Sequence, residues 1–281
     1  MRIDSFKWMH AAVVCVLLCL ACGCGEKEGN IPPPPPPPPS SGTGNNGTGG
    51  SGGSGSTGTT SSAITLDNVA WTLDFEENFD GTSVNTQNWS MYNSQGHAGH
   101  GLRRPSAFSV KDGNLVITAE MQDDKVVSGG MRHRKDYLYP VRFEFRARCE
   151  EDPSLAMSGV VLTWPKEGSK EDNGELDVFE TGHSRQSRRP LNTFIHYRGG
   201  KQIHKTHDVD ASEWQEMAMD WFENSLHIYL NGERVWDIND KSKVPDTMHH
   251  ICLQLDAFEH EMKGTCHMYV DYVRIYTGSR K

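Results

Sequence analysis

Three carboxylates fall within six residues of this 281-residue chain, in the segment Glu175–Glu180 with the sequence ELDVFE. Acidic residues that cluster in this way usually face solvent on a polar surface. Here they are interleaved with Leu176, Val178 and Phe179, which are typical of a hydrophobic core. The segment therefore predicts a β-strand with one apolar face and one acidic face.

A regular strand would not place all three carboxylates on one face. Because side chains alternate along a strand, Glu175 and Asp177 would face one way and Glu180 the other way, into the core. One extra residue between Asp177 and Glu180, a β-bulge, shifts the alternation and returns Glu180 to the face of the other two. We therefore predict a bulge in this strand, a feature that is frequent beside active sites.

Two carboxylates on one face of such a strand could act together on a glycosidic bond. The bulged strand spans roughly 13 Å between the Cα atoms of Glu175 and Glu180, counting about four steps of ~3.3 Å. Side chains that lean together could bring the carboxyl groups to about 5–5.5 Å, as in a retaining glycosidase, whereas inversion needs about 6.5–9.5 Å. The charge of Asp177 between them could hydrogen-bond one glutamate and raise the pKa of its neighbour, which gives the two groups different protonation states.

The pattern E-x-D-x-x-E resembles that of glycoside hydrolase family 16, which contains the laminarinases and related endo-glycanases. It is similar to the bulged six-residue form of the motif and not to the shorter form of the lichenases and xyloglucan-modifying enzymes. The resemblance implies that Glu175 is the nucleophile and that Glu180 is the acid/base. It also implies that Asp177 is the carboxylate that assists the nucleophile.

Other segments resemble the same family, in the same order along the chain. They are LDFEENFDG at 73–81, VKDGNLVI at 110–117, the Trp164-Pro165 loop with Gly174, and VDYVRIY at 270–276. The resemblance therefore covers residues 64–281. It implies a concanavalin A-like jelly roll, a β-sandwich of two curved antiparallel sheets in which the substrate crosses the concave sheet.

The residues by themselves also predict one all-β domain over 64–281. Short alternating strands recur, and we find no long amphipathic helical pattern. The clearest strands are 115–119, 143–148, 214–222, 226–230, 233–238 and 268–276. Asn231-Gly232 between two of them is a strong type I′ hairpin signal. Many strands joined by turns indicate a sandwich or a barrel, and the pattern alone does not choose between them.

The first 24 residues predict export. Residues 1–24 combine Arg2 and Lys7 with a short apolar run at 11–21. That run is too short for a transmembrane helix and is typical of a signal peptide. The small residues before Cys22 and Cys24 resemble a bacterial lipoprotein signal, so either cysteine could carry the lipid, and an ordinary secretion signal is the alternative.

The next segment, residues 25–63, cannot form a core. It contains an unbroken proline run and then a Gly/Ser/Thr-rich stretch. We therefore predict a disordered linker with a stiff part and a flexible part. Together with the leader, it predicts an exported, membrane-anchored bacterial lipoprotein that faces the periplasm or the cell exterior.

Four residues outside the acidic strand are candidates for substrate binding. Trp164 could stack on the apolar face of a sugar ring, and a core tryptophan is the alternative. His196 is expected on the next strand, where a neutral imidazole could hydrogen-bond Glu180 or the sugar, and a structural histidine is the alternative. Gln254 and Asp256 share one face of a later strand and could reach sugar hydroxyls.

No catalytic metal or cofactor is predicted. His204 and His207 are three residues apart, and His249 and His250 are adjacent, but neither spacing is diagnostic in strands or loops. A structural calcium is implied by the family resemblance alone, with the carboxylate of Asp271 and a backbone carbonyl near Gly113 as ligands. The acidic residue expected before Phe79 is an asparagine here, which argues against that calcium.

Charge and cysteine content limit the partners. The formal net charge is −9 and we see no basic patch, so neither nucleic acid nor a polyanionic substrate is expected. The domain holds Cys149, Cys252 and Cys266, an odd number that leaves at least one thiol free and does not reveal whether two of them pair. We expect a monomer whose partners are a polysaccharide and, through the lipid, a membrane.

These observations predict a secreted, endo-acting, retaining glycoside hydrolase. The expected substrate is a β-1,3-glucan or a β-1,3/1,4-glucan, because the bulged motif is common among enzymes that cleave them. Galactans such as agarose or carrageenan, and transfer of the sugar to another sugar instead of water, are alternatives within the same enzyme class. A lectin-like binding module is the alternative outside it, but binding does not need three mutually repelling carboxylates.

Overall fold

The computed structural model describes residues 63–66 and 68–280, and the fold is reported for them alone. The predicted signal peptide, with Cys22 and Cys24, and all but the last residue of the predicted linker lie outside the described residues. Within the described residues, no helix is long and apolar enough to cross a bilayer.

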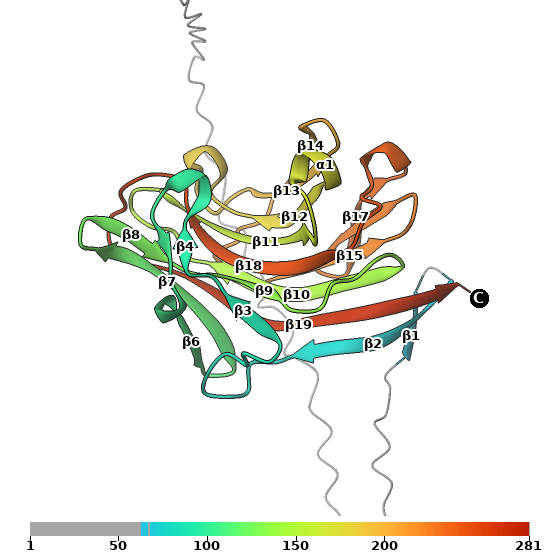
Figure 1. The fold of residues 1–281 in the computed structure, drawn as a ribbon, viewed down its shortest axis with the longest axis horizontal. Coiled ribbons are helices and arrows are strands. Elements are labelled where there is room, and N and C mark those ends of the chain that lie inside the picture. The colour runs from blue at the N-terminus through green and yellow to red at the C-terminus, as the bar shows by residue number, and fades with distance from the viewer. Residues whose placement is uncertain (1–62, 67, 281) are drawn as a thin grey trace, which may run out of the picture. The chain divides into compact units, whose positions relative to one another are not determined.

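The first sheet carries seven strands (Figure 1). In sheet order they are β14 (Lys201–His207), β13 (Leu191–Tyr197), β12 (Glu175–Glu180), β11 (Met157–Pro165), β18 (His249–Ala257), β9 (Gly130–His133) and β3 (Trp89–Met91). All neighbours in this sheet are antiparallel. The acidic strand β12 therefore lies inside the sheet, with a partner on each side.

The second sheet has twelve strands and covers one face of the first. Its main path is β17 (Glu233–Ile238), β16 (Leu226–Leu230), β15 (Gln215–Trp221), β10 (Val141–Cys149), β19 (Cys266–Arg280), β7 (Asn114–Gln122), β8 (Lys125–Ser128), β5 (Leu102–Arg103) and β4 (Ser94–Gln95). Off this path, β1 (Ala63–Leu66) pairs with β2 (Val69–Glu77), β2 with β19, and β6 (Phe108–Lys111) with β7. Only the β5–β8 pair is parallel among the described pairs.

The two curved, largely antiparallel sheets confirm the predicted jelly-roll sandwich (Figure 1). The predicted strands are all present, with ends that differ by a few residues. The hairpin at Asn231-Gly232 joins β16 to β17, and both residues have positive φ, at 50° and 83°, as a type I′ turn requires. Helices in the described residues are short turns, namely α1 (Lys170–Asn173), η1 (His97–Gly99), η2 (Pro105–Ala107), η3 (His183–Arg185) and η4 (Lys241–Lys243).

The core fills the space between the sheets and fixes the orientation of β12. Leu176 and Phe179 of β12 are fully buried in it, and the rings of Phe179 and Phe145 of β10 lie 6.4 Å apart. Burying each such side chain stabilises the fold by about 1.5–3 kcal/mol. Because this face of β12 is held in the core, its carboxylates are held on the opposite face.

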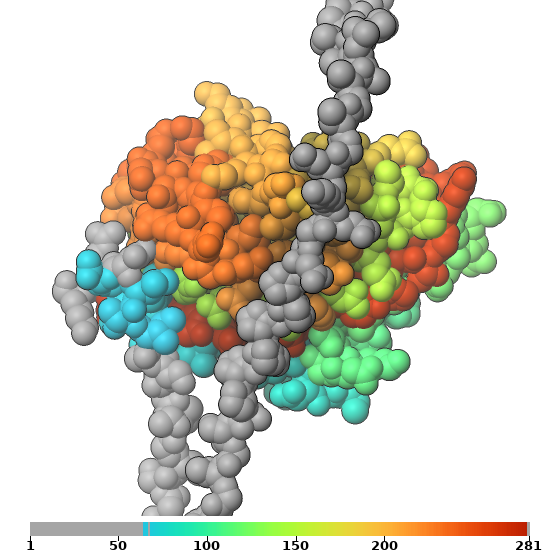
Figure 2. Space-filling model, turned by 180° about the vertical axis from the view of Figure 1, so that it is seen from behind, coloured from blue at the N-terminus to red at the C-terminus, as the bar shows by residue number. Residues whose placement is uncertain are grey.

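A second, smaller hydrophobic cluster lies at one side of the larger sheet. Trp71 of β2 packs against Phe222, just after β15, with ring centroids 5.8 Å apart. Figure 2 shows these two segments, in blue and orange, side by side when the molecule is seen from behind. This cluster lies on the larger sheet, whereas the acidic face belongs to the smaller one.

Candidate active site

The predicted bulge is present in β12. Asp177 pairs with Phe194 of β13 and Glu180 with Asn192, so three residue steps on β12 are matched by two on β13. The extra residue leaves the Val178 carbonyl outside the regular ladder, where the buried Thr193 hydroxyl donates to it at 2.9 Å. The bulge thus comes with its own hydrogen-bond donor on the neighbouring strand.

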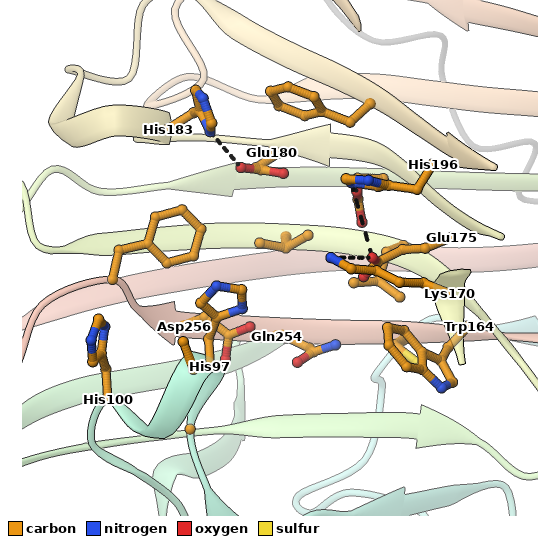
Figure 3. Close-up of a pocket in the computed structure, with 18 of the residues that line it drawn as sticks. His97, His100, Trp164, Lys170, Glu175, Glu180, His183, His196, Gln254 and Asp256 are labelled. Carbon is orange, nitrogen blue, oxygen red and sulfur yellow. Dashed lines mark ion pairs between the residues drawn. The ribbon is translucent and has the colours of Figure 1, made fainter. Parts of the chain in front are cut away.

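All three carboxylates reach the same cleft, which crosses the open face of the seven-stranded sheet and has a volume of about 900 Å³. Glu175, Asp177 and Glu180 line it, and each is more than nine-tenths buried. Figure 3 shows Glu175 and Glu180 directed into this cleft from one strand. The strand therefore supplies three acidic groups to one enclosed space, as its sequence predicted.

Glu175 has a cationic neighbour that the sequence did not reveal. The ammonium of Lys170, in α1, lies 3.2 Å from Oε2 of Glu175. Burial is the main cause that raises the pKa of Glu175 to about 7, and Asp177 adds to the rise whenever it is ionised, while Lys170 and, when protonated, His196 oppose it. Glu175 therefore changes its charge near neutral pH.

Asp177 lies against His196, which we had expected to contact Glu180 or the sugar. Nε2 of His196 is 3.0 Å from Oδ2 of Asp177 and 4.0 Å from Oε2 of Glu175. Burial, reinforced by the charge of Glu180, raises the pKa of Asp177 well above its ordinary value. Burial lowers the pKa of His196, against the opposing charge of Glu175. Both shifts favour the neutral forms of the two side chains.

Glu180 is paired with His183 rather than with His196. Nδ1 of His183 lies 3.3 Å from Oε1 of Glu180, and this hydrogen bond raises the pKa of His183. His183 is placed by Gly182, which has a φ of 66°, and whose added Cβ would lie 2.6 Å from the Met157 carbonyl oxygen. Only glycine fits there, so the chain turns into η3 and directs His183 back to the acid.

Two predicted binding residues line the cleft walls. Trp164 is partly exposed in the cleft at the end near Lys170 (Figure 3), where a sugar face could stack on it. Gln254 is buried, and its Oε1 has no hydrogen-bond partner among the described residues. An orphaned acceptor facing a cleft is available to a ligand hydroxyl. Both placements suit the predicted roles, which stay predictions.

Asp256 also lines the cleft, but its carboxylate is engaged. Nε and Nη2 of Arg103 each donate to one of its oxygens at 2.8 Å. Burial raises the pKa of Asp256, and the positive charge of Arg103 opposes that rise. The structure thus gives Asp256 a structural partner, and its predicted contact with sugar hydroxyls stays a prediction.

Sequence reasoning missed Lys170, His183, Arg103 and His97, all of which line the cleft. Arg103 and His97 belong to segment 93–108, which forms one wall of the cleft. The pair Gly182-His183, two residues after the end of the acidic strand, was an available signal for His183, whereas no local pattern indicated Lys170.

Two groups of residues bear on metal binding. Ligand atoms of Glu175, Asp177 and His196 lie within 4.8 Å of one another, a spacing that could suit an ion. We assign none there, because the Lys170 ammonium already supplies a positive charge beside Glu175. The predicted calcium ligand Asp271 forms an ion pair with Arg146 at 2.7 Å, which argues against calcium binding near Gly113. The calcium stays a prediction.

The three cysteines of the domain are buried free thiols. Cys252 lines the cleft, and its sulfur accepts from the Tyr92 hydroxyl at 3.4 Å. Burial raises the pKa of Cys252 to about 12, so its thiol is neutral. We therefore assign Cys252 no nucleophilic role.

A protein-family model matches residues 74–263, the segment that contains the whole acidic strand and most of the cleft. It describes a 3-keto-alpha-glucoside-1,2-lyase-like domain. The curated endo-1,3-1,4-beta-glycanase ExoK of Rhizobium meliloti is 24% identical over 177 residues, which cover 61% of this chain and 64% of that protein. The match thus spans less than two thirds of that relative.

Solved structures share the fold. An endo-beta-1,3-glucanase from Pyrococcus furiosus superposes with a TM-score of 0.67 at 19% identity, covering 78% of this chain and 99% of that one. A laminarinase from Flavobacterium sp. UMI-01 gives 0.63 at 19% identity, covering 73% and 100%. At such low identities these matches establish the jelly-roll architecture alone.

Proposed function

This chain belongs to the family of 3-keto-alpha-glucoside-1,2-lyase-like domains, and we propose that it acts as an endo-acting, retaining glycoside hydrolase of the family 16 type. One observation carries the proposal. A bulged strand directs Glu175, Asp177 and Glu180 into a single cleft, with the apolar residues of that strand in the core. A binding module would have no use for three buried carboxylates that line one cleft.

The proposed reaction uses the two glutamates in turn. The carboxylate of Glu175 attacks the anomeric carbon while protonated Glu180 gives its proton to the departing glycosidic oxygen. Water then attacks the anomeric carbon of the resulting glycosyl-enzyme and gives a proton to Glu180. The bond between that carbon and Glu175 breaks, which frees the Glu175 carboxylate. Asp177 lies between them on the strand and, while neutral, can donate its one hydrogen bond to the Glu175 carboxylate. Two displacements at one carbon retain its configuration.

We propose a β-1,3-glucan or β-1,3/1,4-glucan as the substrate. The names of the glycanase relative and of the structural neighbours support this choice, as does the partly exposed Trp164 in a cleft that is open to a polymer. One neighbour, with a TM-score of 0.64, is an endo-acting O-glycanase that initiates mucin breakdown, so mucin O-glycans belong in any substrate panel.

Product release from laminarin, lichenan, agarose, carrageenan, xyloglucan and mucin tests the proposal. We expect oligosaccharides from laminarin or lichenan, whose first-formed reducing ends keep the β configuration in ¹H NMR. Glu175→Gln and Glu180→Gln should each lose activity, by about 10²–10⁴-fold for the acid/base. Inverted products would overturn the mechanism, and release from another glycan alone would overturn the substrate.

The family description favours a second candidate, a lyase that acts on a 3-keto-α-glucoside. In such a sugar the C3 ketone acidifies the C2 proton. A base in the cleft would remove that proton, a C1=C2 bond would form, and the glycosidic oxygen would leave with a proton from an acid. Hydrolysis in H₂¹⁸O separates the two, because a hydrolase places ¹⁸O at C1 and a lyase first forms an ultraviolet-absorbing enone without it.

Export and lipid anchoring remain part of the proposal. The leader sequence supports them, and metabolic labelling with a radioactive fatty acid in a bacterial host tests them. Label that is lost in Cys22→Ala or in Cys24→Ala identifies the modified cysteine. A cleaved but unlabelled protein would instead support an ordinary secretion signal.

A further inference from the structure

Lys170 occupies an unusual position beside the proposed nucleophile. Three permanently charged cations line the cleft in the described part of the chain, namely Arg103, Arg185 and Lys170. Arg103 is taken up by Asp256 and Arg185 lies 3.6 Å from Glu259. Lys170 alone among them forms an ion pair with a carboxylate of β12, at 3.2 Å from Glu175.

The turn that carries Lys170 is anchored to the sheet. The backbone N–H of Gly174 donates to the Lys170 carbonyl at 2.9 Å, which closes α1 directly before Glu175. The Asn173 carbonyl accepts from Nε2 of His249, a fully buried residue of β18, at 3.1 Å. Arg198 donates from the outer side to the Asp172 carbonyl at 3.0 Å. Lys170 is therefore presented to the cleft by a turn that is fixed on two sides.

Glu175 needs such a partner. Its side chain is buried beside Asp177, and burial favours the neutral carboxylic acid, which is a poor nucleophile. The other groups that face it offer little compensation. His196 of β13 is 4.0 Å away and is held neutral by burial, and the Cys252 thiol of β18 is neutral as well. Glu180 on the same strand adds a further negative charge next to Asp177.

We propose that Lys170 is a positioning residue for the nucleophile, which favours the ionised form of the Glu175 carboxylate and keeps it directed into the cleft. The inference rests on the proposed role of Glu175. It identifies the ammonium on α1 as the group that lets a buried glutamate attack at neutral pH. The partner of Glu180 is His183, which can itself titrate, and this suits an acid/base that must give up and take back a proton. The partner of Glu175 is the permanently charged Lys170, and this suits a nucleophile that attacks in its ionised form.

Three variants of the full chain test this role. Lys170→Met removes the charge and keeps most of the stem, and Lys170→Arg keeps the charge. Lys135→Met is the matched control, because Lys135 forms an ion pair with Asp74 at 2.6 Å and does not line the cleft. The first readout is the acidic limb of the pH profile of kcat/KM on laminarin or lichenan, which reports ionisation of the free nucleophile.

We expect the acidic limb of Lys170→Met to move to higher pH by about one to three pH units, since an opposite charge at this distance lowers a carboxyl pKa by that much. At pH values below the wild-type limb, kcat/KM should be lower than in the wild type by about tenfold for each pH unit by which the limb has moved. Lys170→Arg should keep the limb near that of the wild type, whatever its effect on kcat, and Lys135→Met should not move it. A limb that stays in place in Lys170→Met would overturn the proposal.

A second readout does not depend on turnover. Carboxyl ¹³C-labelled glutamate is titrated by NMR, and the signal of Glu175 is assigned as the one missing in Glu175→Gln. The Glu175 titration should move upward in Lys170→Met and stay in place in Lys135→Met. If this upward movement appears but no glycan in the panel is cleaved, the ion pair is established and the proposed hydrolase is wrong. If cleavage occurs and neither readout moves, the hydrolase stands and the role of Lys170 is wrong.

Discussion

The chemistry of this cleft depends on pairs of side chains in which each carboxylate has a basic partner. Lys170 lies against Glu175, His196 against Asp177 and His183 against Glu180. The partners differ in kind, since one is permanently charged, one is neutral through burial, and one is poised to titrate. Three chemically similar acids in one cleft therefore have different electrostatic surroundings.

The pairing of His183 gives a residue-scale prediction. The hydrogen bond to Glu180 is the main cause of the raised pKa of His183, while burial opposes it. In Glu180→Gln, we expect the His183 pKa to fall below its wild-type value, because the charge that stabilises the imidazolium is gone. ¹H–¹⁵N NMR of the imidazole across pH 5–9 measures it. Glu259→Gln, which removes another cleft carboxylate, should leave it in place, and an unchanged pKa in Glu180→Gln would show that the contact is not formed in solution.

At the scale of elements, the bulge in β12 decides which residues share a face. Its support comes from Thr193 of β13, which donates to the Val178 carbonyl and contacts Nε2 of His207 at 2.9 Å. All three residues are buried. Without the hydroxyl, the carbonyl and the imidazole would both lose a partner in a site that water does not reach.

We therefore expect Thr193→Val to lower the free energy of unfolding by about 1–3 kcal/mol, the cost of leaving a buried polar group without its partner. Activity should fall as well, by up to about 100-fold, because a loosened bulge displaces Glu180. Urea unfolding and kcat measure the two effects. Thr206→Val, at an exposed position of β14, is the control. Unaltered stability in Thr193→Val would mean that the bulge does not need the Thr193 hydrogen bond.

The Arg103–Asp256 pair connects the ends of the two sheets, since Arg103 lies on β5 and Asp256 on β18. Removing the cation in Arg103→Met leaves a buried carboxylate unpaired, which costs about 3–5 kcal/mol. Burial already raises the pKa of Asp256, and without Arg103 it rises further, so the loss should shrink as pH falls and the carboxyl protonates. Unfolding in urea at pH 7.5 and pH 4.5 measures this.

An exposed pair provides the comparison for that variant. Arg189 donates to Asp208 at 2.7 Å, but both side chains are largely in solvent. Arg189→Met should therefore cause no measurable change at either pH. The double variant Arg103→Met with Asp256→Asn should recover part of the loss, because the buried charge is gone. A loss in Arg103→Met no larger than that in Arg189→Met would contradict the prediction.

The sequence predicts a structural feature well when the residues that determine it are neighbours in the chain. The alternation of Leu176, Val178 and Phe179 with acids predicted both the strand and its bulge, because side-chain direction along a strand follows from neighbouring residues. The cationic partners Lys170 and Arg103 were not predicted. Arg103 meets Asp256 across 153 residues, a contact that no local pattern encodes. Lys170 lies closer in sequence, but it reaches Glu175 through a turn that depends on the buried His249.

At the scale of the whole molecule, a buried acid in a cleft affects the stability of the fold. Burial raises the pKa of Glu175 to about 7, whereas a glutamate in the unfolded chain titrates near 4.5. Between these two values the native state binds more protons than the unfolded state. The stability of the protein that is linked to this group therefore falls as pH rises from about 4.5 to 7, and it stays low above that range.

Replacing Glu175 with glutamine removes this titration, so we expect Glu175→Gln to abolish activity and to stabilise the protein at the same time. The gain should be small near pH 4.5, should grow with pH, and should level off above pH 7 at on the order of 3 kcal/mol, from a pKa difference of about 2.5 between the folded and unfolded states. Urea unfolding of both proteins at pH 4.5, 6 and 8 measures it. The buried His249, whose pKa is lowered to about 4, makes the native state lose stability toward acid, but it does so equally in both proteins and cancels in their difference. If the gain in stability were the same at every pH, the difference in stability between the two proteins would come from packing and not from the buried charge of the proposed nucleophile.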